Sequence, residues 1–284
     1  MKYLSKAATI LKTLCILALF STPSSYTNFG FIIPTYVTTE THKIVLRECL
    51  RKIRLYHANP IVLINDHSPL DISEIQKEFA NVSIESSMIK GAGEMNPYLH
   101  FYAHKYFDTA IILHDSMHLN KPLERVDSIQ DIKFIRYFTN HIFHWNLIQE
   151  PKTYYNEQHG IIVHDDLIIH LLKRILSEKN KLFLNFCLER YAQKKQWVGC
   201  FGIQTIITHN FLKELHNKTN ILDFATITNN RRSRCAMESI FALACHYLRD
   251  TEYLKNNAYD GLYFDGITPG KLVTENFNKI SLGR

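Results

Sequence analysis

The stretch Ala110-Ile111-Ile112-Leu113-His114-Asp115-Ser116 carries an apolar run directly into an aspartate. A short, continuously apolar run is typical of a strand that is buried on both faces of a sheet. The aspartate would then stand at the carboxyl end of the strand, where open α/β sheets bind ligands. The stretch predicts a strand over residues 109–114 and a functional carboxylate at Asp115. The plainer alternative is a strand-end aspartate that caps a turn.

Two earlier stretches repeat this pattern. Ile61-Val62-Leu63-Ile64-Asn65 leads to Asp66, and Phe31-Ile32-Ile33 leads to Pro34-Thr35. Alternation of strands with helices favours a parallel sheet with right-handed crossovers and one cleft lined by strand ends. A turn role for Asp66 and helix entry for Thr35 remain alternatives. The expected elements of this half are strands over 29–35, 61–64 and 82–85 and helices over 38–56, 71–79 and 94–106.

The second half of the chain is less regular. Apolar spacing predicts helices over 165–176, 181–191, 208–216 and 231–248, and a strand over 197–207. The segment 131–145 fits neither pattern, and the tail from residue 256 looks irregular. Internal repeats, low-complexity tracts and a recognisable linker are all lacking from the sequence. We therefore expect residues 29–284 to form a single domain.

The first 28 residues resemble a targeting segment. Lys2, Lys6 and Lys12 precede a short apolar core over 14–20, and small polar residues follow it. This order is typical of a signal peptide, and the core is shorter than the roughly 20 residues of a membrane-spanning helix. Residues 1–28 are predicted to be a signal peptide or signal anchor, with possible membrane association. An amphipathic or disordered leader is the alternative.

The composition of the 284 residues is that of a globular protein, with 46% hydrophobic and 21% charged residues. The formal net charge is +6, but the basic residues are scattered and do not interleave with aromatic residues in a stripe. This argues against nucleic acid as a partner. The six cysteines have no CxxC spacing, which argues against zinc, and their disulfide pairing is left open.

Phe31-Ile32-Ile33-Pro34-Thr35 resembles the first strand of family-2-type glycosyltransferases with the GT-A fold. Asn65-Asp66-His67-Ser68 is similar to their next strand end. Lys90-Gly91-Ala92-Gly93 and the run to Asp115 follow the family's order of Gly-rich loop, helix and metal-binding Asp-x-Asp. The resemblance covers roughly residues 29–120, and the chain also resembles a glycosyltransferase-like group of giant viruses. It implies an α/β, GT-A-like (Rossmann-like) fold with a mixed, mainly parallel sheet flanked by helices.

The resemblance also implies a donor site with a metal. Asp115 and His118 would ligate Mn²⁺ or Mg²⁺ at the diphosphate, although Met117 stands in place of the family's second aspartate. Carboxylate oxygens suit either cation. The expected nucleotide-binding residues are Pro34, Thr35, Asp66, Gly91, Gly93 and Arg231.

On the acceptor side, Trp197-Val198-Gly199-Cys200-Phe201-Gly202 resembles the family's acceptor strand, with Trp197, Gly199 and Gly202 as contacts. A bulge in a packed strand is the alternative. Arg231-Arg232-Ser233-Arg234-Cys235-Ala236-Met237-Glu238 is similar to the segment that holds the family's acidic pair. The similarity implies that Glu238 is the general base. The alternative is that Glu238 is a solvated helix residue.

The function implied is metal-assisted transfer of a sugar from a nucleotide-sugar donor to a hydroxyl of a glycan or protein. The alternative is a catalytically inactive GT-A-like protein that binds glycans or partners, which Met117 favours. His114-Asp115 and His164-Asp165-Asp166 superficially resemble HD phosphohydrolases, but that fold is all helical. If residues 1–28 act as a targeting segment, we expect the chain in the secretory pathway or at a membrane. If they do not, we expect it in the cytoplasm or in a viral factory.

Overall fold

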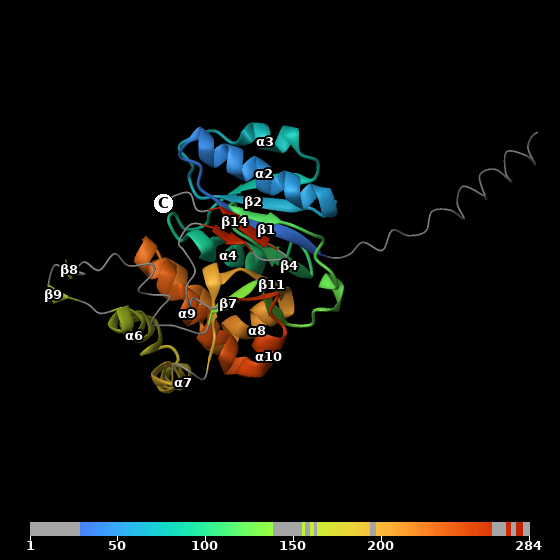
Figure 1. Cartoon of the computed structure of the whole chain (residues 1–284). Helices are drawn as coiled ribbons and strands as arrows, with labels where there is room; N and C mark the ends of the chain where they lie inside the picture. Colours follow the sequence, from blue (N-terminus) through green and yellow to red (C-terminus); the bar gives the residue numbers. More distant parts are fainter. Residues whose placement is uncertain are drawn as a thin grey trace, which may run out of the picture.

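The computed structural model describes residues 29–138, 155–156, 160–161, 164–193, 197–262, 271–273 and 277–280. Its centre is a six-stranded sheet of order β3-β2-β1-β4-β11-β6 (Figure 1). Strands β3, β2, β1 and β4 run parallel, and β11 is antiparallel to both of its neighbours. The expected mixed, mainly parallel sheet is confirmed. The strands are β1 (Phe29–Thr35), β2 (Ile61–Asn65), β3 (Val82–Ser86), β4 (Thr109–Ile112), β6 (Ile132–Phe134) and β11 (Thr205–Thr208).

Helices cover both faces of this sheet (Figure 1). Alternate residues of β1 point to opposite faces, so Phe31 and Ile33 join one apolar core and Ile32 joins the other. The first core lies under α2 (Glu40–Tyr56) and α3 (Ser73–Glu78). On the other face lie α4 (Asn96–His104), α6 (His164–Leu176), α7 (Lys181–Ala192), α8 (His209–Thr219), α9 (Arg231–Leu248) and α10 (Thr251–Asn256).

Helix α2 shows why the local sequence folds as it does. Thr39 caps its N-terminus by accepting a hydrogen bond from the backbone N–H of His42, and the helix then buries an apolar stripe that includes Leu46 and Ile53. Ion pairs join it to α3, with Lys43 Nζ lying 3.0 Å from a carboxylate oxygen of Glu74. The predicted helix over 38–56 is confirmed, with its start moved to residue 40.

Smaller sheets complete the described structure. Sheet order β10-β7-β12 joins β10 (Gly199–Cys200), β7 (Arg136–Phe138) and β12 (Asp260–Leu262). Sheet order β13-β14-β5 joins β13 (Lys271–Val273), β14 (Phe277–Ile280) and β5 (Met117–Leu119), and β8 (Tyr155–Asn156) pairs with β9 (Gly160–Ile161). The described residues also form the 3-10 helices η1 (Gly93–Met95), η2 (Val126–Ser128), η4 (Phe201–Ile203) and η5 (Ile221–Ile227).

These elements correct two sequence-based expectations. The strand predicted over 197–207 is divided, because η4 turns the chain at Gly202 between β10 and β11. The tail predicted to be irregular contributes three strands in its described parts, and two of them, β12 and β14, pair with strands more than a hundred residues earlier in the chain. Such long-range pairing is invisible to a local periodicity argument.

Other expectations concern the cysteines and the leader. Within the described ranges, Cys49, Cys187, Cys200, Cys235 and Cys245 form no disulfide, and all but Cys235 are buried. The predicted leader over 1–28 lies outside the described residues. Among the helices that the structure describes, none combines the length and apolar character needed to cross a membrane.

Candidate functional site

The carboxyl ends of β1, β2 and β4 bring Thr35, Asp66 and Asp115 to one edge of the sheet. The hydroxyl of Thr35 donates to Asp115 Oδ2 at 3.2 Å, and the backbone N–H of Asp66 donates to the Thr35 carbonyl at 2.9 Å. All three residues are nearly buried, with 2%, 8% and 5% of their surface exposed, respectively. Thr35 therefore links the Asp115 carboxylate to the backbone of Asp66. Parallel strands explain why, because their carboxyl ends meet at the same edge.

The Asp66 carboxylate is oriented by two donors. Ser87 Oγ and the backbone nitrogen of Gly91 each lie 2.9 Å from its Oδ1. Gly91 has a φ of +82°, a conformation that L side chains rarely adopt, so a glycine allows the loop to present this N–H. The side chain of Asn96 holds the same loop by bonding both the N–H and the carbonyl of Ile89, at 3.1 and 2.9 Å.

The rest of the loop passes beneath the start of α9. Gly93 also has a positive φ, +48°, and a Cβ placed there would lie 2.7 Å from Cδ of Arg234. Arg231, a predicted nucleotide ligand, is exposed and lies one helical turn before Arg234. The structure thus brings Gly93 of the loop against Arg234, one helical turn from Arg231.

Pro34, another predicted donor-side residue, is half-buried in β1 and pairs in register with Ile64 of β2.

The turn that carries Asp115 is tied to η4. The backbone N–H of His114 donates to Gln204 Oε1 at 3.2 Å, and His114 Nε2 lies 2.9 Å from the Gly202 carbonyl oxygen. Gly202 is close enough that an added Cβ would stand 2.7 Å from the His114 ring. These contacts join the donor-side strand end to the segment predicted to face the acceptor.

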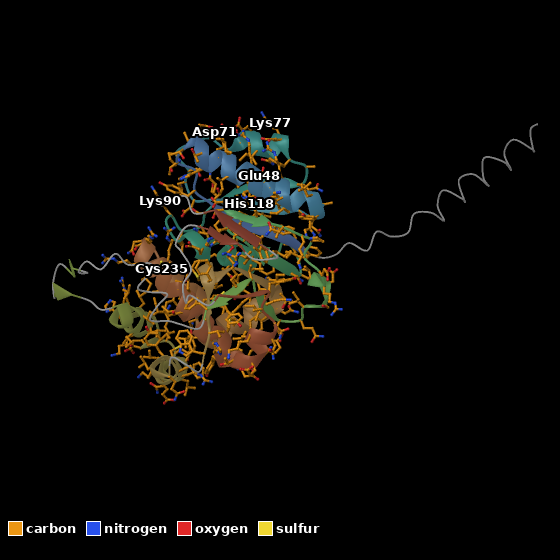
Figure 2. All side chains as sticks on the ribbon, in the orientation of Figure 1. Glu48, Asp71, Lys77, Lys90, His118 and Cys235 are labelled. Carbon is orange, nitrogen blue, oxygen red and sulfur yellow. The ribbon has the colours of Figure 1, made fainter. Side chains whose placement is uncertain are left out.

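The expected metal ligands do not converge. Met117, at the place of the second aspartate, has no exposed surface and belongs to the apolar core beneath α2. His118 lies in β5, and Glu48, Val45 and Lys52 of α2 act on the pKa of its ring. Figure 2 labels His118 and Glu48. Burial lowers the pKa of His118. Among the described residues, no group of three or more His, Cys, Asp or Glu side chains is placed to hold a metal. Asp115 is therefore the one expected metal ligand at this strand end, and binding of Mn²⁺ or Mg²⁺ there stays a prediction.

Glu238 lies near the middle of α9 and is 9% exposed. Burial raises the pKa of Cys235 to about 12, and the negative charge of Glu238 adds to this shift. Glu238 also contributes, after burial and Cys245, to the raised pKa of Cys200. These effects place the carboxylate beside two thiols on the side of α9 that packs against β10 and η4.

The predicted acceptor residues occupy packed positions. Trp197 is 1% exposed, and its ring lies 5.9 Å from that of Tyr191. A Cβ added to Gly199 would meet the Phe138 ring at 2.0 Å. The Phe138 side chain thus requires a glycine at position 199. This agrees with the alternative in which the segment is a packed strand. An acceptor role for Trp197, Gly199 and Gly202 stays a prediction.

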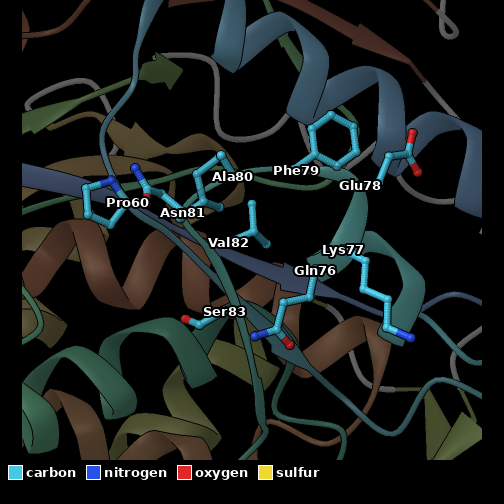
Figure 3. A pocket seen from close by; sticks show the side chains of 10 residues that line it. Pro60, Gln76, Lys77, Glu78, Phe79, Ala80, Asn81, Val82 and Ser83 are labelled. Atoms are coloured by element: carbon cyan, nitrogen blue, oxygen red, sulfur yellow. The ribbon is translucent and has the colours of Figure 1, made fainter.

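A surface hollow lies elsewhere on the molecule. It has a volume of about 670 Å³ and is lined by Pro60, Ile61 and residues 76–83 (Figure 3). Ile61 and Val82 begin β2 and β3, so this hollow lies at the amino ends of the strands, opposite the candidate site. None of the predicted site residues lines it.

Three site residues were not singled out by the sequence patterns. Ser87 follows β3 directly, so the strand-end rule that selected Asp66 would have found it. Asn96 is a fully buried polar residue before Pro97, at a helix start. Gln204 is fully buried between Ile203 and Thr205, and nothing in the local sequence signals its bond to His114.

No protein-family model matches the chain, and no curated protein matches it. Similarity is found among solved structures. One is S. aureus TarS 1–349 in complex with UDP, with 12% identity and a TM-score of 0.39, over 74% of this chain and 54% of that one. A second structure of S. aureus TarS 1–349 gives 11% identity and a TM-score of 0.38, over 76% and 56%.

A further match is the apo structure of WbbM, a bifunctional glycosyltransferase. It shows 8% identity and a TM-score of 0.41, over 77% of this chain and 38% of that one. The chain thus spans about half of the TarS 1–349 structures that it matches, and less of WbbM.

Proposed function

We propose that this chain transfers a sugar from a nucleotide-sugar donor to a hydroxyl group of a glycan or protein. The observation that carries the proposal is the Thr35 bridge, in which one residue bonds Asp115 through its hydroxyl and Asp66 through its carbonyl. Two carboxylates at the carboxyl edge of a mainly parallel sheet stand where such sheets bind ligands. The glycine loop beside Asp66, with Arg231 and Arg234 of α9, completes the donor side.

In this proposal Asp66 recognises the base of the nucleotide. A carboxylate offers about four acceptor positions, and Ser87 and Gly91 use only part of this capacity. The same two donors fix the direction of the carboxylate before a ligand arrives, which lowers the entropic cost of binding. We expect an N–H group of the nucleotide base to donate to the lone pairs of the Asp66 carboxylate that these two donors leave unused.

Glu238 is the proposed general base. Its carboxylate takes the proton of the acceptor hydroxyl as that oxygen forms a bond to the anomeric carbon of the sugar. The bond from that carbon to the diphosphate oxygen breaks, and its electron pair leaves with the nucleoside diphosphate. Negative charge therefore grows on the diphosphate and must be compensated. The proposal routes no step through a metal, because Met117 and His118 leave Asp115 as the one expected ligand at this strand end.

The test is calorimetric titration of the chain with UDP and with GDP, followed by chromatography of donor hydrolysis. We expect saturable binding of one nucleotide. Glu238→Gln should retain this binding and lose turnover by a factor of roughly 100 or more, the usual contribution of a general base. Asp71→Asn, an exposed change at the start of α3, is the matched control and should leave both unchanged. If the unmodified chain binds neither nucleotide, with or without Mn²⁺, the proposal is wrong.

A second candidate function is nucleotide or glycan binding without catalysis. Met117 favours it, because the position of the family's second carboxylate is part of the apolar core. Saturable nucleotide binding together with no hydrolysis or transfer across a panel of nucleotide sugars would select this candidate.

A further inference from the structure

Arg231, Arg234 and Glu238 share one face of α9, because residues three, four and seven apart lie on the same side of a helix. Arg234 extends from this face across Gly93: a Cβ at position 93 would stand 2.7 Å from its Cδ and 2.9 Å from its Nη1. The side chain is 35% exposed, so its guanidinium is partly open to solvent. Lys90 adds a further exposed cation to the same loop (Figure 2).

Arg234 is oriented but not saturated by its protein partner. Its Nε lies 3.8 Å from Glu94 Oε2, close enough for an ion pair and too far for a hydrogen bond. Within the described residues neither buried atom makes a hydrogen bond. A guanidinium carries five N–H donors in a planar fork, which matches two oxygens of a phosphate. The side chain thus presents unused donors beside the loop that Asp66 holds.

The position of this cation is informative because the metal site is incomplete. Asp115 Oδ2 already accepts the hydroxyl of Thr35, Met117 is in the core, and His118 faces α2. The proposed reaction still requires positive charge at the leaving diphosphate. Arginine supplies a charge that does not titrate in proteins, on a side chain whose shape suits phosphate.

We propose that Arg234, assisted by Arg231, compensates the charge of the donor diphosphate in place of a divalent cation. This inference rests on the proposed function and deepens it. The loop from Ser87 to Gly93 would then separate base recognition by Asp66 from diphosphate recognition by α9. Binding of the diphosphate depends on the arginine and on ionic strength, and it does not depend on Mn²⁺ or Mg²⁺.

The experiment measures the affinity of a nucleoside diphosphate and of the matching monophosphate, with UDP and UMP or GDP and GMP as the probes. Each titration is run with Mn²⁺ and with EDTA. For Arg234→Gln we expect the diphosphate to bind roughly 10 to 100 times more weakly, as for loss of a charge-assisted contact. The monophosphate should lose less than about threefold. EDTA should leave the affinity of the unmodified chain within about twofold.

Arg232→Gln is the matched control, because it removes the same charge from an exposed residue of the same helical turn that lies on another side of α9. It should leave the diphosphate affinity within about threefold. Arg234→Lys keeps the charge and loses the fork, so an intermediate affinity is expected. This variant, with the salt dependence of the unmodified chain, keeps the test decisive if Arg234→Gln folds poorly.

The inference is overturned if EDTA abolishes diphosphate binding, if Arg234→Gln binds as the unmodified chain does, or if Arg232→Gln loses as much. Each of these results requires that the unmodified chain binds nucleotide. A chain that binds neither the diphosphate nor the monophosphate overturns the proposed function itself, so the two failures are distinguishable.

Discussion

The Asp66 carboxylate combines two tasks that are separable by mutation. It accepts the hydroxyl of Ser87 and the N–H of Gly91, and it is proposed to accept a donor from the nucleotide base. The first task concerns the stability of the loop, and the second concerns the ligand. Variants that remove the carboxylate or only one of its donors therefore have different expected effects.

Asp66→Ala should lower the free energy of unfolding by about 2 kcal/mol, because the Gly91 N–H loses a charged acceptor in a nearly buried site. Nucleotide affinity should fall at least about tenfold. Ser87→Ala removes one of the two donors that orient the carboxylate, so it should cost about 1 kcal/mol and weaken nucleotide binding by less than about threefold. Urea unfolding and calorimetry measure the two effects. Unchanged nucleotide binding by Asp66→Ala would contradict the assigned role.

The sequence predicted that Thr35, Asp66 and Asp115 share one edge of the sheet, but not that His118 lies beside α2. Asp66, Asp115 and Thr35 follow apolar runs, so their shared edge was foreseeable from strand periodicity alone. The close approach of Phe138 to Gly199 was not, because it depends on how two distant segments pack. Periodicity reports which face a residue takes and carries no information on the side chain that lies opposite.

Among the elements, α9 connects stability to the site. Its start is held by a capping box in which Asn230 Oδ1 accepts the Ser233 N–H at 3.0 Å and Ser233 Oγ accepts the Asn230 N–H at 3.2 Å. Arg234 and Glu238 lie within the following two turns. The cap therefore helps to fix the positions of Arg234 and Glu238, the residues proposed to contact the donor and the acceptor.

Asn230→Ala should cost about 1 kcal/mol of folding free energy, the usual effect of losing an N-cap side chain. Fraying of the first turn should also weaken nucleoside diphosphate binding, because Arg234 would lose its fixed position over Gly93. The control is Asp250→Ala, which removes the N-cap of α10, where Asp250 Oδ1 accepts the Tyr253 N–H at 2.7 Å. This variant should lose about the same stability and keep its affinity for the nucleoside diphosphate. Equal binding by both variants would show that the cap does not act on the site.

The elements themselves were largely predictable from the sequence. β1 and α9 have the expected bounds, since apolar runs and helical spacing are local signals. The segment over 131–145 fits neither pattern, and its described part contains β6 and β7, which are three residues each and too short to show a periodicity. The division of 197–207 depends on the turn at Gly202 and the partners of β11, which no local pattern encodes.

For the molecule as a whole, buried histidines connect stability to pH. Burial lowers the pKa of several of them below the usual 6.5: His57, His100, His118, His209 and His216. The unfolded chain therefore binds protons more readily than the folded chain just below pH 6.5. The stability that these histidines contribute is fully present above pH 6.5. It is lost as the pH falls toward their lower pKa values in the folded state.

His57 offers the clearest test of this prediction, because its Nε2 accepts the Leu123 N–H at 3.1 Å and must be unprotonated to do so. Burial, and then the nearby charge of Arg54, lowers the pKa of this ring. We expect the urea midpoint to fall between pH 7 and pH 5, with a smaller fall for His57→Gln than for the unmodified chain. His67→Gln alters an exposed ring and is the control. A midpoint that is flat or rises toward pH 5 would contradict this linkage.

The placement of β11 between β4 and β6 has a consequence for the newly synthesised protein. Once Ile112 has left the ribosome, β4 can join β1, but its other edge has no neighbour until Thr205 is made. At ordinary elongation rates this delay is roughly 5 to 20 seconds. Throughout that interval an apolar, unpaired strand edge is available to other nascent chains, which is the geometry that leads to aggregation. Production of the intact protein should therefore benefit from slow induction and abundant chaperones.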